Sequence, residues 1–307
     1  MCGVRNRSIL APKEREQPMR VIDAFDKPVR ALAVSPDGRL LAAAAPMEFA
    51  VWDWVNGTEL IRQRLPSPAG QVTFAPDASW VSCAERVGAF GVFATRTGKQ
   101  THAFPALWSG GVAVSPDGKT LAATRAGQRG RTKLECWELP GLRPKTGFDF
   151  WSPFARLAFS PNGEFLAGIS TDLFELRVSV SGGLNGRHRV NYVGDGFFSF
   201  SRDSQWAVFG WETDLHVMDT RNGNVLMMRV TQPENRAFLD VAFLSSRHFI
   251  TVDGTPAVRV WSADSWAIER EYDWGCGGLT CATVSPDGLA GVCGTRTGKV
   301  VVFDVDE

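Results

Sequence analysis

The chain has 307 residues, with 33 basic and 33 acidic side chains that give a formal net charge of zero at pH 7. This balance argues against non-specific binding to nucleic acid, which depends on net basic charge or a basic face. Apolar residues make up 44% of the sequence, alongside 31 glycines and 17 prolines, which excludes a disordered chain and predicts a well-cored protein with many turns.

Residues 1–18 are predicted to form a flexible N-terminal tail. They carry charges but lack the apolar stretch of a signal peptide, and the sequence has no run of eighteen apolar residues that would cross a membrane. We therefore expect a cytoplasmic protein with no membrane partner. The next segment, residues 19–25, has the composition of a strand and precedes the first repeat.

The first repeat begins with an apolar strand that ends at the turn Ser35-Pro36-Asp37-Gly38. Proline presets the backbone φ angle, the aspartate side chain bonds nearby backbone groups, and glycine tolerates a positive φ angle. Asn56-Gly57 is a strong signal for a second tight hairpin. Four short antiparallel strands are predicted in this repeat: 29–34, 39–45, 48–54 and 60–65.

The same turn recurs along the chain. It is unchanged at 115–118 and 285–288, and weaker copies stand at 75–78, 160–163, 201–204 and 244–247. The seven copies start 40 to 45 residues apart, so one supersecondary unit is repeated seven times. Four strands per copy fit small sheets packed radially around an axis, whereas the frequent glycines and prolines argue against helical repeats.

The third predicted strand of each repeat also recurs, at 90–94, 134–138, 176–180, 215–219, 258–262 and 300–304. With Trp52-Asp53 as its one intact Trp-Asp pair, the chain resembles WD40-repeat proteins over residues 19–307. The resemblance implies an all-β fold: a single-domain, seven-bladed β-propeller of four-stranded antiparallel blades. Because the last repeat has no fourth strand of its own, residues 19–25 are expected to complete the last blade and to bury Val21, Ile22 and Phe25.

The chain departs from the family pattern at the Gly-His pair that many WD40 repeats carry about ten residues before the turn. The residues at this point are Phe25, Leu65, Pro105, Phe150, Asn191, Glu234 and Gly275, with no histidine among them. Packing of large aromatic side chains is expected to replace the missing histidine hydrogen bonds.

The predicted innermost strands place seven residues at equivalent points of a central channel, four residues before each turn: Ala31, Gln71, Gly111, Arg156, Phe197, Asp240 and Cys281. Only Asp240 is acidic, whereas a calcium or hydrolase site needs several converging oxygens or a nucleophile with a base. Arg156 and Asp240 are candidates for an ion pair across the channel. This composition predicts that the protein is not an enzyme.

The histidines and cysteines show no spacing typical of a metal site. His102, His188, His216 and His248 are scattered over different strands, and the cysteines fall mostly within apolar strands. We expect packed or surface roles for both residue types, with no cofactor and no metal. Cys276 and Cys281 are close enough in the sequence for a disulfide to stay an alternative.

Aromatic residues gather in the connections between repeats, which in WD40-like propellers lie on a face that often binds partners. The candidates are Trp108, Phe150, Trp151, Trp211 and Trp274. Exposed, they would anchor a partner; packed inward, they would replace the missing histidine network. Both interpretations stay open from the sequence.

The segment 125–133 is the sharpest local charge feature and is predicted to lie on the same face. Its cationic residues are Arg125, Arg129, Arg131 and Lys133, which suit an acidic peptide or a phosphate, although a solvated loop is the alternative. Glu212 and Asp214, beside Trp211, belong to the equivalent loop across the ring, so this face is expected to have a basic side and an acidic side.

The favoured function is a non-enzymatic scaffold or adaptor that binds a protein or peptide on this face, with Arg129 and Arg131 pairing acidic groups while Trp151 or Trp108 anchors an apolar side chain. One alternative is a small-molecule-binding or hydrolytic propeller that uses the central channel. A second is an RNA-associated WD40 protein, which the neutral charge disfavours and the basic segment 125–133 supports.

Overall fold

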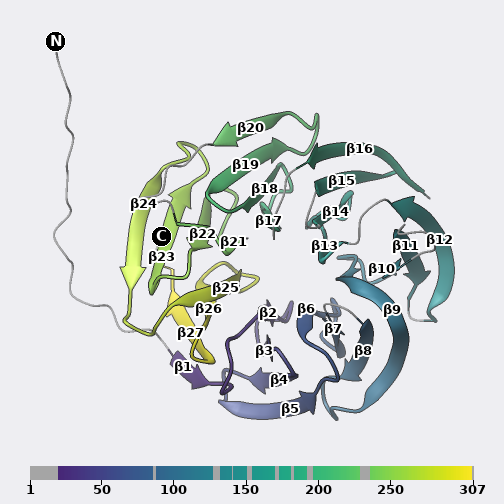
Figure 1. Ribbon diagram of the computed structural model, residues 1–307, viewed down its shortest axis with the longest axis horizontal. Coiled ribbons are helices and arrows are strands. Elements are labelled where there is room, and N and C mark those ends of the chain that lie inside the picture. Colours follow the sequence, from purple (N-terminus) through teal and green to yellow (C-terminus); the bar gives the residue numbers. More distant parts are fainter. Residues whose placement is uncertain are drawn as a thin grey trace.

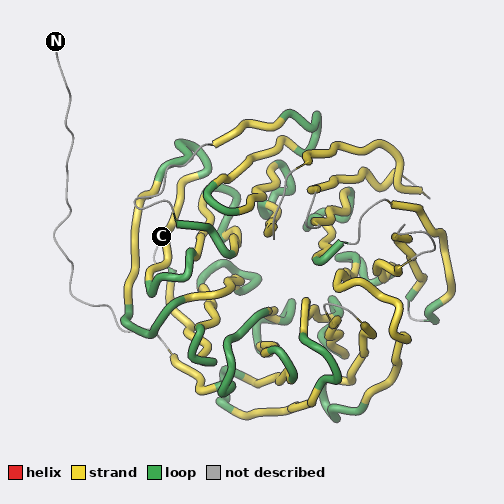
Figure 2. The backbone as a smooth tube through the Cα atoms, viewed as in Figure 1, coloured by secondary structure: helices red, strands yellow, loops and turns green. Residues whose placement is uncertain are grey.

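The computed structural model describes residues 20–85, 88–126, 132–139, 141–150, 154–169, 173–180, 183–191, 196–228 and 236–305. Regular structure in these residues is all β, and the strands form small antiparallel sheets arranged radially around a central opening (Figures 1 and 2). Within this described part, no helix has the length and apolarity needed to cross a membrane. The arrangement is that of a β-propeller with four-stranded antiparallel blades.

Five sheets contain four strands each. The first has β2 (Ala31–Val34), β3 (Leu40–Ala45), β4 (Glu48–Asp53) and β5 (Thr58–Arg64). The second has β13 (Arg156–Phe159), β14 (Phe165–Ile169), β15 (Leu173–Val180) and β16 (Gly183–Asn191). The third has β17 (Gly196–Phe200), β18 (Trp206–Trp211), β19 (Asp214–Asp219) and β20 (Val225–Met228). The fourth has β21 (Asp240–Phe243), β22 (His248–Val252), β23 (Ala257–Ser262) and β24 (Ile268–Asp273). The fifth has β25 (Leu279–Val284), β26 (Ala290–Thr295), β27 (Lys299–Asp304) and β1 (Arg20–Asp23).

The sixth sheet has seven strands, and it corrects the expectation of seven separate blades. Its strands are β6 (Ala69–Phe74), β7 (Trp80–Glu85), β8 (Gly88–Ala94), β9 (Gln100–Val114), β10 (Thr120–Ala126), β11 (Thr132–Glu138) and β12 (Arg143–Phe150). The second and third repeats share this sheet because β9 runs without a break through both. Its early residues pair with β8 and its later residues pair with β10, and Trp108 is paired with both Gly88 and Arg125. Hydrogen bonding therefore joins the strands of the described residues into six sheets.

The N-terminal strand closes the ring, as the sequence predicted. Strand β1 pairs antiparallel with β27, and Ile22 lies opposite Val300. Beyond β1, Phe25 N donates to Gly298 O over 2.9 Å. Phe25 and Ile22 join the core between the first and last sheets, but Val21 is 40% exposed. The expectation that Val21 is buried was wrong, because an outermost strand turns alternate side chains toward solvent.

The repeated turn is held by a hydrogen-bond motif that its sequence encodes. Ser35 Oγ donates to Asp37 Oδ1 over 2.5 Å and accepts from Leu40 N over 2.8 Å, while Arg39 N donates to Asp37 Oδ1. Gly38 completes the turn with a φ angle of +73°. The serine makes the same contacts in four other turns, at Ser115, Ser160, Ser201 and Ser285. A buried hydroxyl therefore ties each of these turns to the strand that follows it.

Candidate interaction face and central channel

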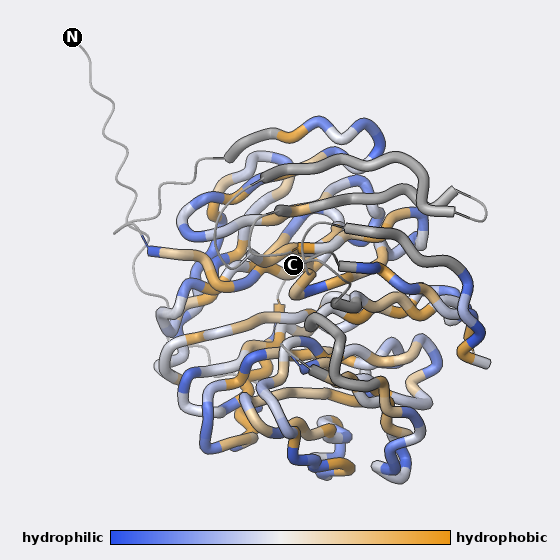
Figure 3. Tube along the Cα trace, turned by 45° about the vertical axis from the view of Figure 1, so that its right-hand side comes forward, coloured by the Kyte–Doolittle hydropathy of each residue, from blue (hydrophilic) through white to orange (hydrophobic). Residues whose placement is uncertain are grey.

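The two ends of the propeller carry different connections. Because neighbouring strands are antiparallel, the turns after the first and third strands of each sheet lie at one end, and the remaining loops lie at the other. Trp54 Nε1, beyond the third strand of the first sheet, donates to Gly38 O over 2.9 Å, which joins the two kinds of turn at one end. We call this end the turn face and the opposite end the loop face. Many of the strands that run between the two faces carry hydrophobic segments (Figure 3).

The two described ends of the basic segment are paired on the loop face. Arg125 at the end of β10 is paired with Lys133 in β11. The Lys133 side chain is exposed, and its Nζ lies 3.8 Å from Glu135 Oε1. Arg129 and Arg131 lie outside the described residues, as does the side chain of Arg125. The backbone pairing thus brings Ala126, at the end of β10, next to Thr132, at the start of β11, on this face.

The acidic counterpart lies on the same face in a two-residue connection between β18 and β19. Glu212 is exposed and has a φ angle of +46°, and its carbonyl oxygen accepts a hydrogen bond from Phe238 N over 2.6 Å. Asp214, the first residue of β19, is half-buried. A backbone hydrogen bond therefore holds this acidic turn against the next connection.

Two of the candidate aromatic anchors stack on other rings. Trp274 is half-buried between Tyr272, with ring centroids 5.7 Å apart, and Phe303, with centroids 4.5 Å apart. Trp211 is half-buried and stacks on His216, with centroids 4.3 Å apart and ring planes at 10°. These contacts match the inward-packing interpretation for both residues.

The remaining anchors are backbone neighbours of the basic hairpin or lie outside the described part. Trp108 is in β9 and Phe150 ends β12, and their side chains fall outside the described residues, as does all of Trp151. Phe150 is paired with Thr132, and Trp108 with Arg125. The structure therefore brings the backbones of Trp108, Arg125, Lys133 and Phe150 to one region of the loop face.

Inward packing is clear at two positions near the missing histidine. Phe25, one of those positions, is 9% exposed and meets Trp52 edge to face with centroids 5.8 Å apart. Phe104 stacks on Phe90 with centroids 4.1 Å apart and ring planes at 12°. Aromatic contacts fix these connections where many WD40 repeats use a histidine.

The central channel is crossed by an ion pair. Arg156 Nη1 donates to Asp240 Oδ1 over 2.8 Å, and Asp240 Oδ2 accepts from Ala282 N over 3.1 Å. Asp240 is 5% exposed. Gln71 forms a second bridge, because its Oε1 accepts from Leu157 N and Val112 N while its Nε2 donates to Leu157 O. The polar channel residues thus link different sheets to one another, both neighbouring sheets and sheets across the channel.

The channel contains a small cavity, and the thiol of Cys281 beside it is protonated. A cavity of about 250 Å³ is bounded in part by Arg30, Gln71, Arg156 and Asp240. Burial raises the pKa of the Cys281 thiol to about 12, so the thiol stays protonated at neutral pH. Among the described residues, no three His, Cys, Asp or Glu side chains come together as metal ligands. The described cysteines are free, so the Cys276–Cys281 disulfide is not formed.

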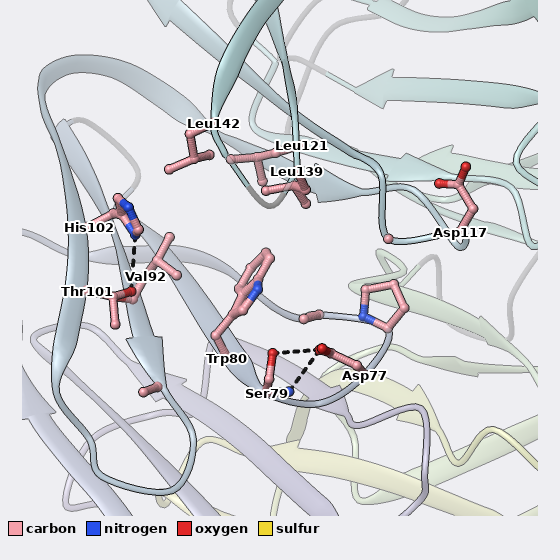
Figure 4. A pocket seen from close by; sticks show the side chains of 14 residues that line it. Asp77, Ser79, Trp80, Val92, Thr101, His102, Asp117, Leu121, Leu139 and Leu142 are labelled. Atoms are coloured by element: carbon pink, nitrogen blue, oxygen red, sulfur yellow. Dashed lines mark hydrogen bonds between the residues drawn. The ribbon is translucent and has the colours of Figure 1, made fainter.

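Sequence reasoning missed a larger cavity on the turn face, between the second and third repeats. It has a volume of about 700 Å³ and includes Trp80, Leu121 and Leu142 in its walls (Figure 4). The signal in the sequence is a comparison of two repeat pairs: Trp80 corresponds to Trp206, whereas Leu142 corresponds to the larger Trp266.

Radially packed four-stranded blades define this chain as a β-propeller. The family model for the WD domain, G-beta repeat (WD40), matches residues 16–53, which include Trp52-Asp53. A stretch of 153 residues is 32% identical to an uncharacterized WD repeat-containing protein of Synechocystis sp. and covers 48% of this chain and 43% of that protein. The match therefore spans less than half of the relative's length. Together with the propeller fold, these partial matches show that the chain is similar to WD40-repeat proteins.

Proposed function

We propose that this propeller is a non-enzymatic scaffold that binds an acidic protein or peptide on its loop face. The observation that carries the proposal is the basic hairpin, in which Arg125 and Lys133 are paired and Lys133 projects an exposed ammonium group. Arg129 and Arg131 lie between them in the sequence and would pair carboxylates or phosphates of the partner.

The arrangement around the hairpin supports an apolar anchor beside the charges. The backbones of Trp108 and Phe150 are paired with the two strands of the hairpin, and Trp151 follows directly in the chain. Aromatic side chains next to cationic groups are typical of the residues that contribute most to protein interfaces. Trp211 and Trp274 would act as packed supports of the face, given their stacked rings.

The channel supports a non-enzymatic role. Its acidic residue, Asp240, is bonded to Arg156 and to the backbone N–H groups of Val241 and Ala282. A carboxylate held by three donors has a structural role that competes with service as a general base. WD40 propellers are, as a family, generally interaction proteins, which favours the same conclusion.

The proposal is tested by affinity capture from the source organism with matched charge reversals. The double variant Arg129→Glu/Arg131→Glu reverses two charges of the basic segment, and Trp151→Ala removes the proposed aromatic anchor. Arg247→Glu is the control, because Arg247 lies on the turn face with a side chain that is 77% exposed. We expect the hairpin variant and Trp151→Ala to lose partners that the control retains. Identical partner sets for all four proteins would show that the loop face is not the binding surface.

A further inference from the structure

The cavity between the second and third repeats lies on the turn face, opposite the hairpin of the proposed function. Figure 4 shows Trp80 projecting from β7 toward Leu139, with Leu121 and Leu142 beside it and Asp77 and Asp117 at one end. The volume of about 700 Å³ is in the range of ligand pockets in proteins. We call this cavity the Trp80 groove.

The protein contains a second place with the same construction. Trp80 is the first residue of β7, directly after the turn 75–78 and Ser79, and Trp206 is the first residue of β18, directly after the turn 201–204 and Gln205. Both tryptophans therefore lie on the same side of the same strand in their repeats. Each faces the repeat that follows it in the chain.

The facing residues also correspond. Leu142 follows Trp137 by five residues and Trp266 follows Trp261 by five residues, in the hairpin after the third strand of each repeat. Both have positive φ angles, +49° for Leu142 and +56° for Trp266. The same position holds glycine in three other repeats, at Gly57, Gly98 and Gly223. A backbone that favours glycine thus keeps a large side chain at the two places that face a tryptophan.

The two places differ in how the space is filled. Trp266 meets Trp206 edge to face, with ring centroids 5.7 Å apart and ring planes at 81°. The ring centroid of Trp266 also lies 6.2 Å from that of Phe249. In the Trp80 groove, Leu142 replaces Trp266 and Leu121 replaces Phe249. An opposite change, Leu139 for Ala263, offsets part of the lost volume. The remaining space lies where the protein's own fold seats an indole ring against tryptophan.

The negative charge at the end of the groove favours a ligand that carries a cationic group next to its aromatic ring. Asp77 and Asp117 supply the formal charges at pH 7 among the described lining residues. Their intramolecular hydrogen bonds in the described part of the chain all go to Oδ1, from Ser79 to Asp77 and from Ser115 and Lys119 to Asp117. Those bonds lower both carboxyl pKa values, and the charges of Lys119 and Lys145 lower the pKa of Asp117 further, so the two groups stay ionised and Oδ2 of each is the oxygen that can meet a cation.

We propose that the Trp80 groove is a second binding site, which takes a protein segment that carries an aromatic residue next to lysine or arginine. The aromatic ring packs edge to face on Trp80, as Trp266 packs on Trp206, and the cation lies near Asp77 and Asp117. This site is independent of the loop face and selects a basic partner, whereas the loop face selects an acidic one.

The test uses a fluorescein-labelled peptide, Gly-Arg-Trp-Arg-Gly, and the purified full chain, with binding followed by fluorescence anisotropy. Peptides with alanine for the tryptophan, or glutamate for both arginines, are expected to bind at least about tenfold more weakly. Leu142→Trp fills the groove with the side chain found at 266, so it is expected to weaken binding by at least about tenfold while the melting temperature stays the same or rises.

Two control variants separate the groove from general effects. Leu289→Trp adds an indole on the turn face at a residue that is 57% exposed, and it should leave binding unchanged. Asp117→Asn keeps the turn, because Asn162 accepts the serine hydroxyl in the same way at 2.7 Å, and it should reduce the preference for arginine over glutamate. Unchanged peptide binding by folded Leu142→Trp, or equally tight binding of indole alone, would overturn the proposal. So would no binding of the arginine peptide by the wild-type protein.

Discussion

Arg156 Nη1 lies 2.8 Å from Asp240 Oδ1, although the two residues are 84 positions apart in the chain. Asp240 also accepts hydrogen bonds from Val241 N over 3.1 Å and from Ala282 N over 3.1 Å. One carboxylate therefore joins the innermost strands of three sheets. Such a contact stabilises the positions of the three sheets relative to one another around the channel.

Replacing Asp240 with alanine is expected to destabilise the protein by about 3 kcal/mol, because it removes one acceptor from Arg156 and from two backbone N–H groups. Urea unfolding followed by tryptophan fluorescence measures this loss. Arg156→Met is the matched variant and should cost less, since Asp240 then keeps two backbone donors. A larger loss for Arg156→Met than for Asp240→Ala would contradict this account.

Phe25→Ala is expected to destabilise the protein by about 3–5 kcal/mol, since the ring is buried against Trp52 and its loss leaves a cavity. Deleting residues 1–26 should have a larger effect, because the outer edge of β27 then loses its partner β1 and is open to aggregation. Val21→Ala, at a residue 40% exposed in β1, should change the melting temperature little. A truncated protein with the same melting temperature as the full chain would show that β1 does not close the ring.

Stability should fall as the pH decreases below about 6.5, partly because of His216. This side chain is 4% exposed and lies in a stack with Phe209 and Trp211. Burial lowers its pKa in the folded state, with a smaller opposing effect from Asp214. The unfolded chain therefore takes up the proton more readily, and stability present above the unfolded pKa is lost as the pH falls toward the folded pKa.

His216→Phe keeps a flat ring in the same stack and removes the titrating group. Melting temperatures of the wild type and this variant, measured from pH 8 to pH 5, should diverge as the pH falls, with the wild type losing more. Parallel curves for the two proteins would show that His216 does not contribute to the pH dependence.

Cysteine alkylation should be selective in the folded protein. Cys276 is half-exposed, whereas burial raises the pKa of Cys136 to about 11 and of Cys281 to about 12. With iodoacetamide at pH 7.5, peptide mass spectrometry should find Cys276 modified well before Cys136 and Cys281. In urea all three should react at similar rates, and equal rates without urea would contradict the buried positions.

Much of the fold could be predicted from the sequence because it repeats short-range signals. The Ser-Pro-Asp-Gly turns and their weaker copies identify the first hairpin of each repeat, and the missing fourth strand after Lys299–Asp304 predicts the role of β1. The continuity of β9 could not be predicted, because whether a strand passes from one sheet to the next depends on tertiary pairing and not on local composition.

The site was less predictable than the fold. The Arg156–Asp240 pair followed from equivalent positions in two repeats, so their meeting at the channel was expected and is confirmed. Whether Trp274 is exposed depends on Tyr272 and Phe303, which are brought together only by packing between neighbouring sheets. The Trp80 groove depends on a difference in side-chain volume between repeats, and motif searching does not measure volume.

The continuous strand β9 has a consequence for the Trp80 groove, whose walls come from the two repeats that β9 joins. Thr101 and His102 of β9 line the groove, and the later residues of β9 pair with β10, which carries Leu121. The two walls are thus tethered by one hydrogen-bonded backbone, which resists widening or collapse of the space between them. The groove is therefore preorganised, and binding of a partner would require little free energy to change its conformation.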